Sequence, residues 1–233
     1  MALPFFYVEL IPDTSATIVL NEETSKHMVQ VLRMNNGSVV QLANGKGKLA
    51  TATIIDAHKK KCTVKIESVS VASPSEKKII IGISLIKNAS RFEWFLEKAT
   101  EIGVAEIFPL SCDRTEKQHF RLERMRGILI SAMLQSQQLW LPEIHEPVPL
   151  SQYIHQNTSQ SKYIAYCGEE YPKQYLANQT SGNDTVILIG PEGDFTPLEV
   201  ESSVSAGFIP VSLGQNRLRT ETAGVTAAVL LNI

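Results

Sequence analysis

The sequence is poor in cysteine, and its few histidines are scattered. The three cysteines stand far apart, at Cys62, Cys112 and Cys167, and no Cys-x-x-Cys pair occurs. None of the five histidines lies at His-x-x-x-His spacing from another. Because structural zinc sites use such spacings, we expect no metal site. An odd, scattered cysteine count also provides no disulfide framework and favours a reducing compartment.

Long apolar runs and an excess of one charge sign are also missing. No apolar run reaches the ~18 residues of a membrane helix, and the opening MALPFFYVELIPD lacks the basic segment and long apolar core of a signal peptide. We therefore expect a cytoplasmic protein with no membrane partner. The chain has 22 Lys and Arg and 24 Asp and Glu. This balance argues against a generally basic nucleic-acid binder but permits a local basic face.

The common phosphate-binding motifs are absent as well. The sequence contains no Gly-x-x-x-x-Gly-Lys-Ser/Thr and no Gly-x-Gly-x-x-Gly. The nearest candidate, Gly45-Lys46-Gly47, lacks the third glycine and precedes a predicted strand. Neither a P-loop nucleotide hydrolase nor a dinucleotide-binding fold is therefore expected.

Residues 1–72 are rich in short β-branched and aromatic stretches, interrupted by one helical pattern at 22–34. The stretches are PFFYVEL, ATIVL, SVVQLAN, KLATATIID and KCTVKIESVS. Five short strands with one helix predict a small β-barrel. The polar stretch 70–78 is interpreted as a linker, so we expect a second domain over 73–233.

Strand and helix patterns alternate within 73–233, which predicts a parallel sheet covered on both faces. The predicted strands are KIIIGISLI, EIFPL, KYIAYC, TVILIG and FIPVSL. Ser90 and Glu93 predict a capping box for the first helix, Gly103 predicts its end, and 120–138 predicts the second helix. The last helix has no charged side chain from Thr222 to Asn232. It must therefore be buried on most sides, in a monomer core or in a two-fold interface.

The segment TVILIGPEGDFTPLE contains a glycine-rich turn between a buried strand and a helix. Thr196 is the predicted N-cap of that helix, Pro197 its first residue, and Glu199 completes a capping box. Ligands of open α/β sheets bind at the carboxyl ends of strands, where glycines allow close approach to the backbone. The alternative is a tight strand-to-helix turn without a ligand.

The segment LGQNRLRTETAG places two arginines before the N-terminus of the last helix. Thr220 is its predicted N-cap, and Glu221 suits the positive end of the helix dipole. Arg217 and Arg219 are disfavoured there, so a functional role is indicated.

Positive charge also gathers in the first 75 residues, chiefly at Lys46, Lys48 and 59–61. These lysines form either a solubilising rim or a phosphate contact.

Four segments together carry a family resemblance. KNASRFEWFLEKATEIGVAEIFPL, QSQQLWLPEI, LIGPEGDFTPLE and LGQNRLRTETA, in this order and spacing, resemble the RsmE-type 16S rRNA uridine N3-methyltransferases of the SPOUT superfamily. HMVQVLRMNNGSVVQL resembles the PUA-like β-barrel of that family, which is associated with RNA binding. The resemblance implies an α/β domain with a deep trefoil knot, the cofactor S-adenosylmethionine, and a homodimer. It also implies methylation of a uridine in 16S ribosomal RNA, within the small ribosomal subunit or its precursor.

The resemblance also assigns residues. It places the cofactor against Tyr166, Cys167, Gly190, Pro191, Glu192, Gly193, Leu213, Gly214, Leu218 and Thr220. An arginine could stabilise the uracil anion, and Arg219, then Arg217, are the candidates. RNA contacts are expected from Arg33, Lys46, Lys48, Lys59, Lys60, Lys61, Arg91 and Arg114. The alternatives are a SPOUT methyltransferase acting on another RNA nucleotide and a non-catalytic RNA-binding dimer.

The sequence departs from the family pattern at three places. Asp194 stands where the family usually has a second glycine after GPEG, and Gln138 where it usually has arginine. In Asn216-Arg217 the arginine is shifted by one position.

Overall fold

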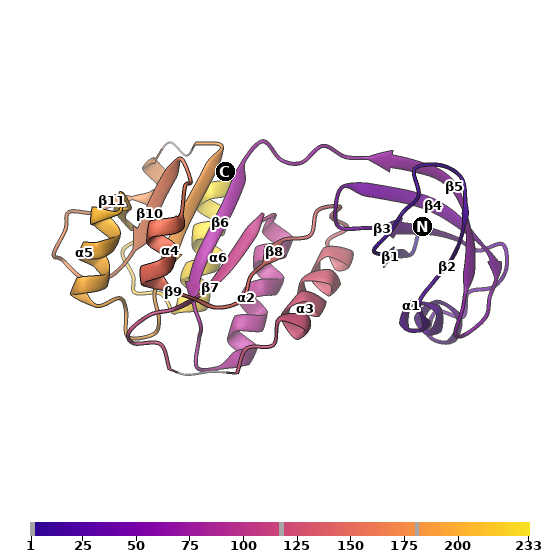
Figure 1. The fold of residues 1–233 in the computed structure, drawn as a ribbon, viewed down its shortest axis with the longest axis horizontal. Helices are drawn as coiled ribbons and strands as arrows, with labels where there is room; N and C mark the ends of the chain where they lie inside the picture. Colours follow the sequence, from indigo (N-terminus) through magenta and orange to yellow (C-terminus); the bar gives the residue numbers. More distant parts are fainter. Residues whose placement is uncertain (1–2, 117–118, 180–181) are drawn as a thin grey trace. The chain divides into compact units, whose positions relative to one another are not determined.

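The structure is a computed structural model that describes residues 3–116, 119–179 and 182–233. The chain forms two compact units (Figure 1). The first comprises the chain up to Pro74 together with Met133–Leu141, and the second comprises Ser75–Ala132 and Pro142–Ile233. None of the helices in the described ranges is long and apolar enough to cross a membrane.

The first unit is a five-stranded sheet in the order β1-β3-β4-β5-β2. The strands are β1 (Phe5–Tyr7), β2 (Thr17–Val19), β3 (Val39–Ala43), β4 (Lys48–Asp56) and β5 (Thr63–Val71). All five stretches predicted as strands are therefore confirmed. β1 pairs with β3 in parallel, and the other pairs are antiparallel. Alternate side chains such as Leu42, Ile54 and Ile66 form the buried core.

The helix of the first unit is shorter than the predicted 22–34. Helix α1 (Glu22–Lys26) continues as one π-helical stretch, η1 (His27–Val31). Arg33 then takes a left-handed backbone with φ 54°, which ends the helix. Asn21 caps the start by accepting from the backbone N of Thr24, and Met28 is fully buried in the core.

The segment Met133–Leu141, which begins within the last turn of a helix at Leu122–Gln135, packs with the first unit although the chain before and after it belongs to the second. Gly47 N donates to Leu139 O over 2.9 Å, and Leu141 N donates to Gly45 O over 2.9 Å. A β-carbon on Gly47 would lie 2.6 Å from the Trp140 ring, so only glycine permits this approach. The glycines of Gly45-Lys46-Gly47 therefore serve backbone pairing.

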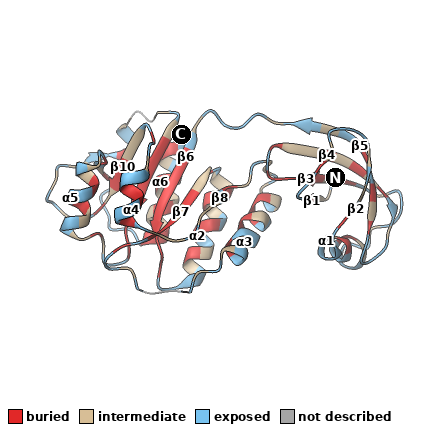
Figure 2. Ribbon diagram, viewed as in Figure 1, coloured by how far each residue is buried: buried red, intermediate tan, exposed pale blue. Residues whose placement is uncertain are grey.

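The second unit is built on a parallel sheet, as predicted, with strand order β11-β13-β10-β12-β6-β7-β8 and β9 also paired to β7. Its strands are β6 (Lys78–Ser84), β7 (Glu106–Ser111), β8 (Glu143–Ile144), β9 (Val148–Pro149), β10 (Ser161–Ala165), β11 (Gln174–Tyr175), β12 (Asp184–Ile189) and β13 (Ile209–Ser212). The central strands are buried nearly throughout (Figure 2), because helices cover both faces of the sheet.

The two faces are covered by different helices. The helices are α2 (Ala89–Ile102), α3 (Leu122–Gln135), α4 (Leu150–Gln156), the 3-10 turn η2 (Leu176–Asn178), α5 (Pro197–Ser205) and α6 (Thr220–Asn232). Ile80 of β6 belongs to the core that α4 and α5 share with the sheet. Ile83, on the opposite face, lies beneath α6, where a β-carbon on Gly224 would be 3.0 Å away. Helix α6 also packs against α2, β6 and β12.

Three predicted helix boundaries need correction. Asn88, not Ser90, caps α2, because its side chain accepts from Ser90 N. Glu93 instead binds Arg124 of α3 at 2.6 Å, so the predicted capping box is wrong. Helix α3 covers Leu122–Gln135, inside the predicted 120–138. The N-cap position of α6 is Arg219, and Thr220 is the first helical residue. Gly103, with φ 94°, ends α2 as predicted.

Candidate functional site: a cleft at the carboxyl edge of the parallel sheet

Three loops meet because their preceding strands are neighbours. Strand β10 pairs with β12 and with β13, and Ala165 lies opposite both Ile189 and Val211. Since all three strands are parallel, the chain leaves them at the same edge of the sheet. The loops after β10, β12 and β13 therefore come together, as expected for a ligand site in an open α/β sheet.

These loops line a cleft of about 940 Å³. Its volume lies near the upper end of the roughly 300–1,000 Å³ usual for small-molecule sites. All ten residues that the sequence assigned to the cofactor line this cleft: Tyr166, Cys167, Gly190, Pro191, Glu192, Gly193, Leu213, Gly214, Leu218 and Thr220. Arg114, Arg217 and Arg219 line it too. The structure thus brings together segments that are far apart in sequence.

The loop after β12 is shaped by the start of α5. Thr196 Oγ1 accepts from Glu199 N over 3.3 Å, and Glu199 Oε2 accepts from Thr196 N over 2.8 Å. This is the predicted capping box, with Pro197 in the first helical turn. A β-carbon on Gly190 would lie 3.1 Å from the Phe195 ring, so the glycine lets the turn close tightly. Local sequence therefore determines where the loop ends.

Two residues from elsewhere in the second unit hold the same loop through hydrogen bonds. Arg114 Nη1 donates to Gly193 O over 2.6 Å and to Phe195 O over 3.4 Å. Lys87 N donates to Glu192 Oε1 over 3.1 Å. Arg114, expected from sequence as an RNA contact, is thus placed against the glycine-rich loop.

The loop after β10 is stabilised by its own side chains. Tyr166 Oη accepts from Tyr171 N over 2.8 Å. Lys173 Nζ donates to Cys167 O over 3.2 Å and to Gly168 O over 2.5 Å, and lies 5.0 Å from the centre of the Tyr166 ring. Burial and the nearby Asp194 carboxylate raise the pKa of the Cys167 thiol, which Arg217 and Lys173 partly offset. Sequence reasoning missed Lys173 because no motif marks it.

The arginine loop leads directly into α6. Ser212 Oγ donates to Gly214 O over 2.8 Å near its start. Arg217 and Arg219 are both exposed, and the side chain of Arg219 makes no capping hydrogen bond to α6. Arg91, expected to bind RNA, instead has its Nε 3.6 Å from Oε1 of the buried Glu221. Glu221 Oε2 is buried and has no hydrogen-bond partner among the residues described.

The chemistry of the cleft fits S-adenosylmethionine, the cofactor that the resemblance implies. Gly193 exposes backbone, while Leu213 and Leu218 provide accessible apolar surface for an adenine ring. The remaining lining carries both charge signs, which suit the carboxylate and ammonium of the amino-acid part: Arg114, Lys173, Glu169, Glu170 and Glu192. No group of three or more potential metal ligands occurs among the residues described.

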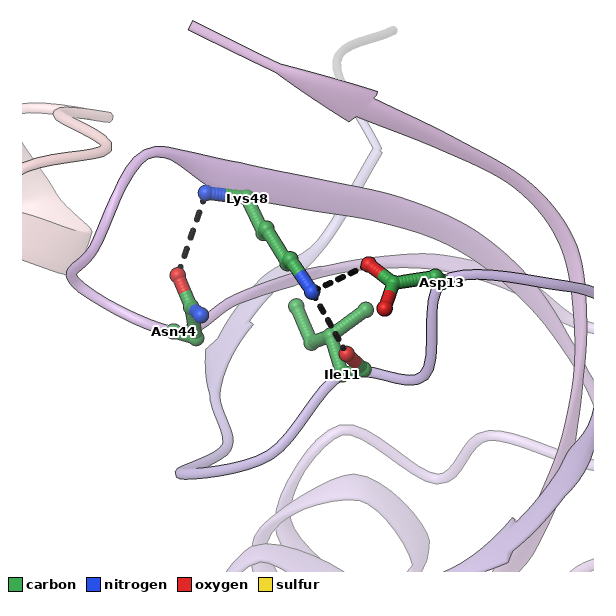
Figure 3. Close-up of polar contacts among 4 residues, drawn as sticks. All are labelled: Ile11, Asp13, Asn44 and Lys48. Carbon is green, nitrogen blue, oxygen red and sulfur yellow. Dashed lines mark hydrogen bonds and ion pairs between the residues drawn. The ribbon is translucent and has the colours of Figure 1, made fainter.

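The basic side chains of the first unit differ in their exposure and in whether a carboxylate already pairs with them. Figure 3 shows Lys48 Nζ donating to Asp13 Oδ1 over 2.5 Å and to Ile11 O over 3.3 Å. The backbone N of Lys48 also donates to Asn44 Oδ1 over 3.1 Å. The other residues expected to bind RNA on this unit are exposed: Arg33, Lys46, Lys59, Lys60 and Lys61. Of these, Lys60 lies 3.4 Å from Glu22.

Comparison with known proteins agrees with this architecture. Residues 73–232 match the RNA methyltransferase domain family, and residues 20–67 match the RNA methyltransferase PUA domain family. Ribosomal RNA small subunit methyltransferase E of Synechocystis sp. is 29% identical, over 93% of this chain and 73% of its own length. The enzyme of the same name from Buchnera aphidicola is 29% identical, over 98% and 92%.

Two solved structures are similar along nearly the whole chain. A probable rRNA-methyltransferase from Porphyromonas gingivalis is 39% identical with a TM-score of 0.90, covering 97% of this chain and 95% of that one. Ribosomal RNA small subunit methyltransferase E from Neisseria gonorrhoeae, bound to S-adenosyl methionine, is 28% identical with a TM-score of 0.88, covering 97% and 95%. The resemblance to RsmE-type enzymes is therefore confirmed, and the chain belongs to the RNA methyltransferase domain family.

Proposed function

We propose that this protein transfers a methyl group from S-adenosylmethionine to N3 of a uridine in small-subunit ribosomal RNA. The observation that carries the proposal is the meeting of the three loops in one cleft, with two exposed arginines at its rim. The family membership and the relatives that methylate small-subunit ribosomal RNA support the same reaction.

The chemistry requires alignment and charge stabilisation. Bound S-adenosylmethionine supplies an electrophilic methyl group, and uracil N3 must lose a proton to accept it. The loops at 190–193 and 213–220 hold the two reactants in line, which is catalysis by proximity. Arg219, with Arg217 second, stabilises the negative charge that develops on the uracil ring. Both side chains are exposed and free to approach an RNA nucleotide.

RNA capture is assigned to the first unit. Lys46, Lys59 and Lys61 are exposed and offer phosphate contacts. Lys48 contributes less than sequence suggests, because Asp13 already neutralises it. Arg91 is assigned to stabilising α6 and Arg114 to stabilising the cofactor loop, in place of their expected RNA contacts.

The finer architecture also belongs to this proposal. Strand β13 lies beyond β10, yet α6, which follows it, packs against β6 and α2 (Figure 1). This return of the chain supports a trefoil knot around the cleft.

Val229 and Ile233 of the C-terminal segment are 40% and 87% exposed. Val229 lies on α6, which has no charged side chain after Glu221, and Ile233 follows its last residue; their exposure supports a homodimer that buries them.

The test is methyl transfer from radiolabelled S-adenosylmethionine to small ribosomal subunits and to free 16S ribosomal RNA, followed by mapping of the labelled nucleotide. Label on N3 of one uridine supports the proposal. Label on a different nucleotide would indicate another RNA substrate. If calorimetry showed RNA binding but no S-adenosylmethionine binding, the alternative of a non-catalytic RNA-binding dimer would be favoured.

A further inference from the structure

Asp194 adopts a backbone conformation that few non-glycine residues take. Its φ is 63°, in the left-handed region, where a side chain other than Asn or Asp is strongly disfavoured. The conformation turns the chain back on itself, since Asp194 N donates to Pro191 O over 2.9 Å. A strained residue of this kind persists only when its surroundings hold it in place.

The carboxylate of Asp194 has a separate backbone donor for each oxygen. Oδ1 accepts from Phe195 N over 2.9 Å, and Oδ2 accepts from Cys167 N over 2.8 Å. Cys167 follows β10, whereas Asp194 follows the glycine-rich turn after β12. A single side chain thus joins two loops that are 27 residues apart in sequence. An amide could not replace it fully, because an amide has only one acceptor oxygen.

We propose that Asp194 is a positioning residue for S-adenosylmethionine. It fastens the turn at 190–193 to the strand end at Tyr166 and Cys167, and so sets the width of the cleft between them. Both segments line the cleft, and Asp194 is only partly exposed. A cleft held at its bound width loses less conformational freedom when the cofactor enters, which increases affinity. This inference rests on the proposed function.

Three variants separate the backbone from the side chain. Asp194→Gly keeps the left-handed turn at no steric cost but removes both acceptors. Asp194→Asn tolerates the turn and keeps one acceptor. Glu201→Gln is the control, because it removes a carboxylate from an exposed position on α5 outside the cleft.

The experiment combines calorimetry with S-adenosylmethionine, amide hydrogen exchange of the unliganded protein, and thermal melting. For Asp194→Gly we expect about tenfold weaker cofactor binding, the equivalent of one or two lost hydrogen bonds. Exchange at the Cys167 amide should become at least about tenfold faster, because its acceptor is gone. The melting temperature should change little, since the relief of backbone strain offsets the lost bonds. Asp194→Asn should be intermediate and Glu201→Gln unchanged.

Each contrary result has a distinct meaning. Equal cofactor affinity in the wild type and Asp194→Gly would overturn the positioning role while leaving the proposed function intact. A large fall in melting temperature, with faster exchange throughout the second unit, would overturn it in favour of a role in fold stability. A wild-type protein that binds no S-adenosylmethionine would overturn the proposed function, and this inference with it.

Discussion

The guanidinium of Arg114 donates a 2.6 Å hydrogen bond to the carbonyl oxygen of Gly193, in the turn that follows β12. A β-carbon on Gly193 would lie 3.2 Å from Cδ of Arg114, so the glycine makes room for the arginine stem. Arg114 thus supports the cleft from outside the two segments that the sequence marks most clearly.

Replacing Arg114 should weaken cofactor binding. Arg114→Ala removes a charged donor from two carbonyl oxygens, and a hydrogen bond from a charged group contributes about 1.5–3 kcal/mol when shielded from water. Since Arg114 is exposed, we expect the lower part of that range, about a tenfold rise in the dissociation constant for S-adenosylmethionine. Calorimetry measures it, with the exposed Arg121→Ala as control. An unchanged affinity for S-adenosylmethionine would contradict a role for Arg114 in supporting the cleft, and the RNA contact expected from sequence would remain as its role.

Replacing Arg219 should slow the reaction and leave the cleft intact. Arg219→Ala removes no capping bond from α6, so melting temperature and cofactor affinity should stay near wild type. Turnover should fall by roughly 10²–10³, as for the loss of one preorganised donor. Arg219→Lys should recover little, because lysine lacks the planar fork of arginine. Single-turnover assays measure the rate. Parallel losses of affinity and melting temperature would show that Arg219 only shapes the loop, and a near-wild-type rate would exclude both roles.

Charge reversal at Lys46 and Lys48 should have different effects. Lys46 is exposed, and its backbone forms a β-bridge with Trp140. Lys46→Glu should therefore weaken RNA binding and reduce the magnitude of the slope of log affinity against log salt concentration by about 1–2. Lys48→Glu places a second carboxylate beside Asp13, so it should also lower the melting temperature. Filter binding at several salt concentrations tests this, with cofactor affinity as the internal control. Equal RNA binding by Lys46→Glu and the wild type would show that Lys46 is not part of the RNA-binding surface.

The three thiols should differ in reactivity. Burial raises the pKa of all three thiols, that of Cys112 to about 12, but Cys167 is exposed in the cleft while Cys62 and Cys112 are buried. Because the reagent must reach a thiolate, iodoacetamide at about pH 8 should modify Cys167 first, and S-adenosylmethionine should protect it. Mass spectrometry of the modified peptides identifies the order. Modification of Cys112 before Cys167 would contradict the burial seen in the structure.

The pKa of Cys112 also predicts how stability varies with pH. In the unfolded chain this thiol ionises near pH 9, whereas in the folded protein it stays protonated to about pH 12. Its raised folded-state pKa therefore favours the folded state fully below pH 9, and this contribution is lost as the pH rises toward 12. Urea unfolding of Cys112→Ser at pH 8 and pH 10.5 tests this. Its loss of stability with pH should be smaller than that of the wild type.

Local sequence determined the elements and the most distinctive turn. Alternating or continuous β-branched residues marked the strands of the first unit and β6, β7, β10, β12 and β13 of the second, because side-chain period and burial follow directly from backbone geometry. The two-residue strands β8, β9 and β11 are too short to show such a pattern, and they were not predicted. Thr196, Pro197 and Glu199 marked the start of α5, because capping involves only neighbouring residues. The glycine-rich turn and the arginine loop could likewise be located from their own residues, and their family resemblance indicated a shared cofactor.

Tertiary structure decided which of these residues act together. The ten residues assigned to the cofactor form one cleft because β13, β10 and β12 are adjacent, an order that no local pattern encodes. The bond from Cys167 to Asp194 spans 27 residues, and that from Arg114 to Gly193 spans 79. Arg91 was expected to contact RNA, yet it lies beside a carboxylate of α6. A charged side chain takes the partner that the fold brings within reach, and that partner is not set by its neighbours in sequence.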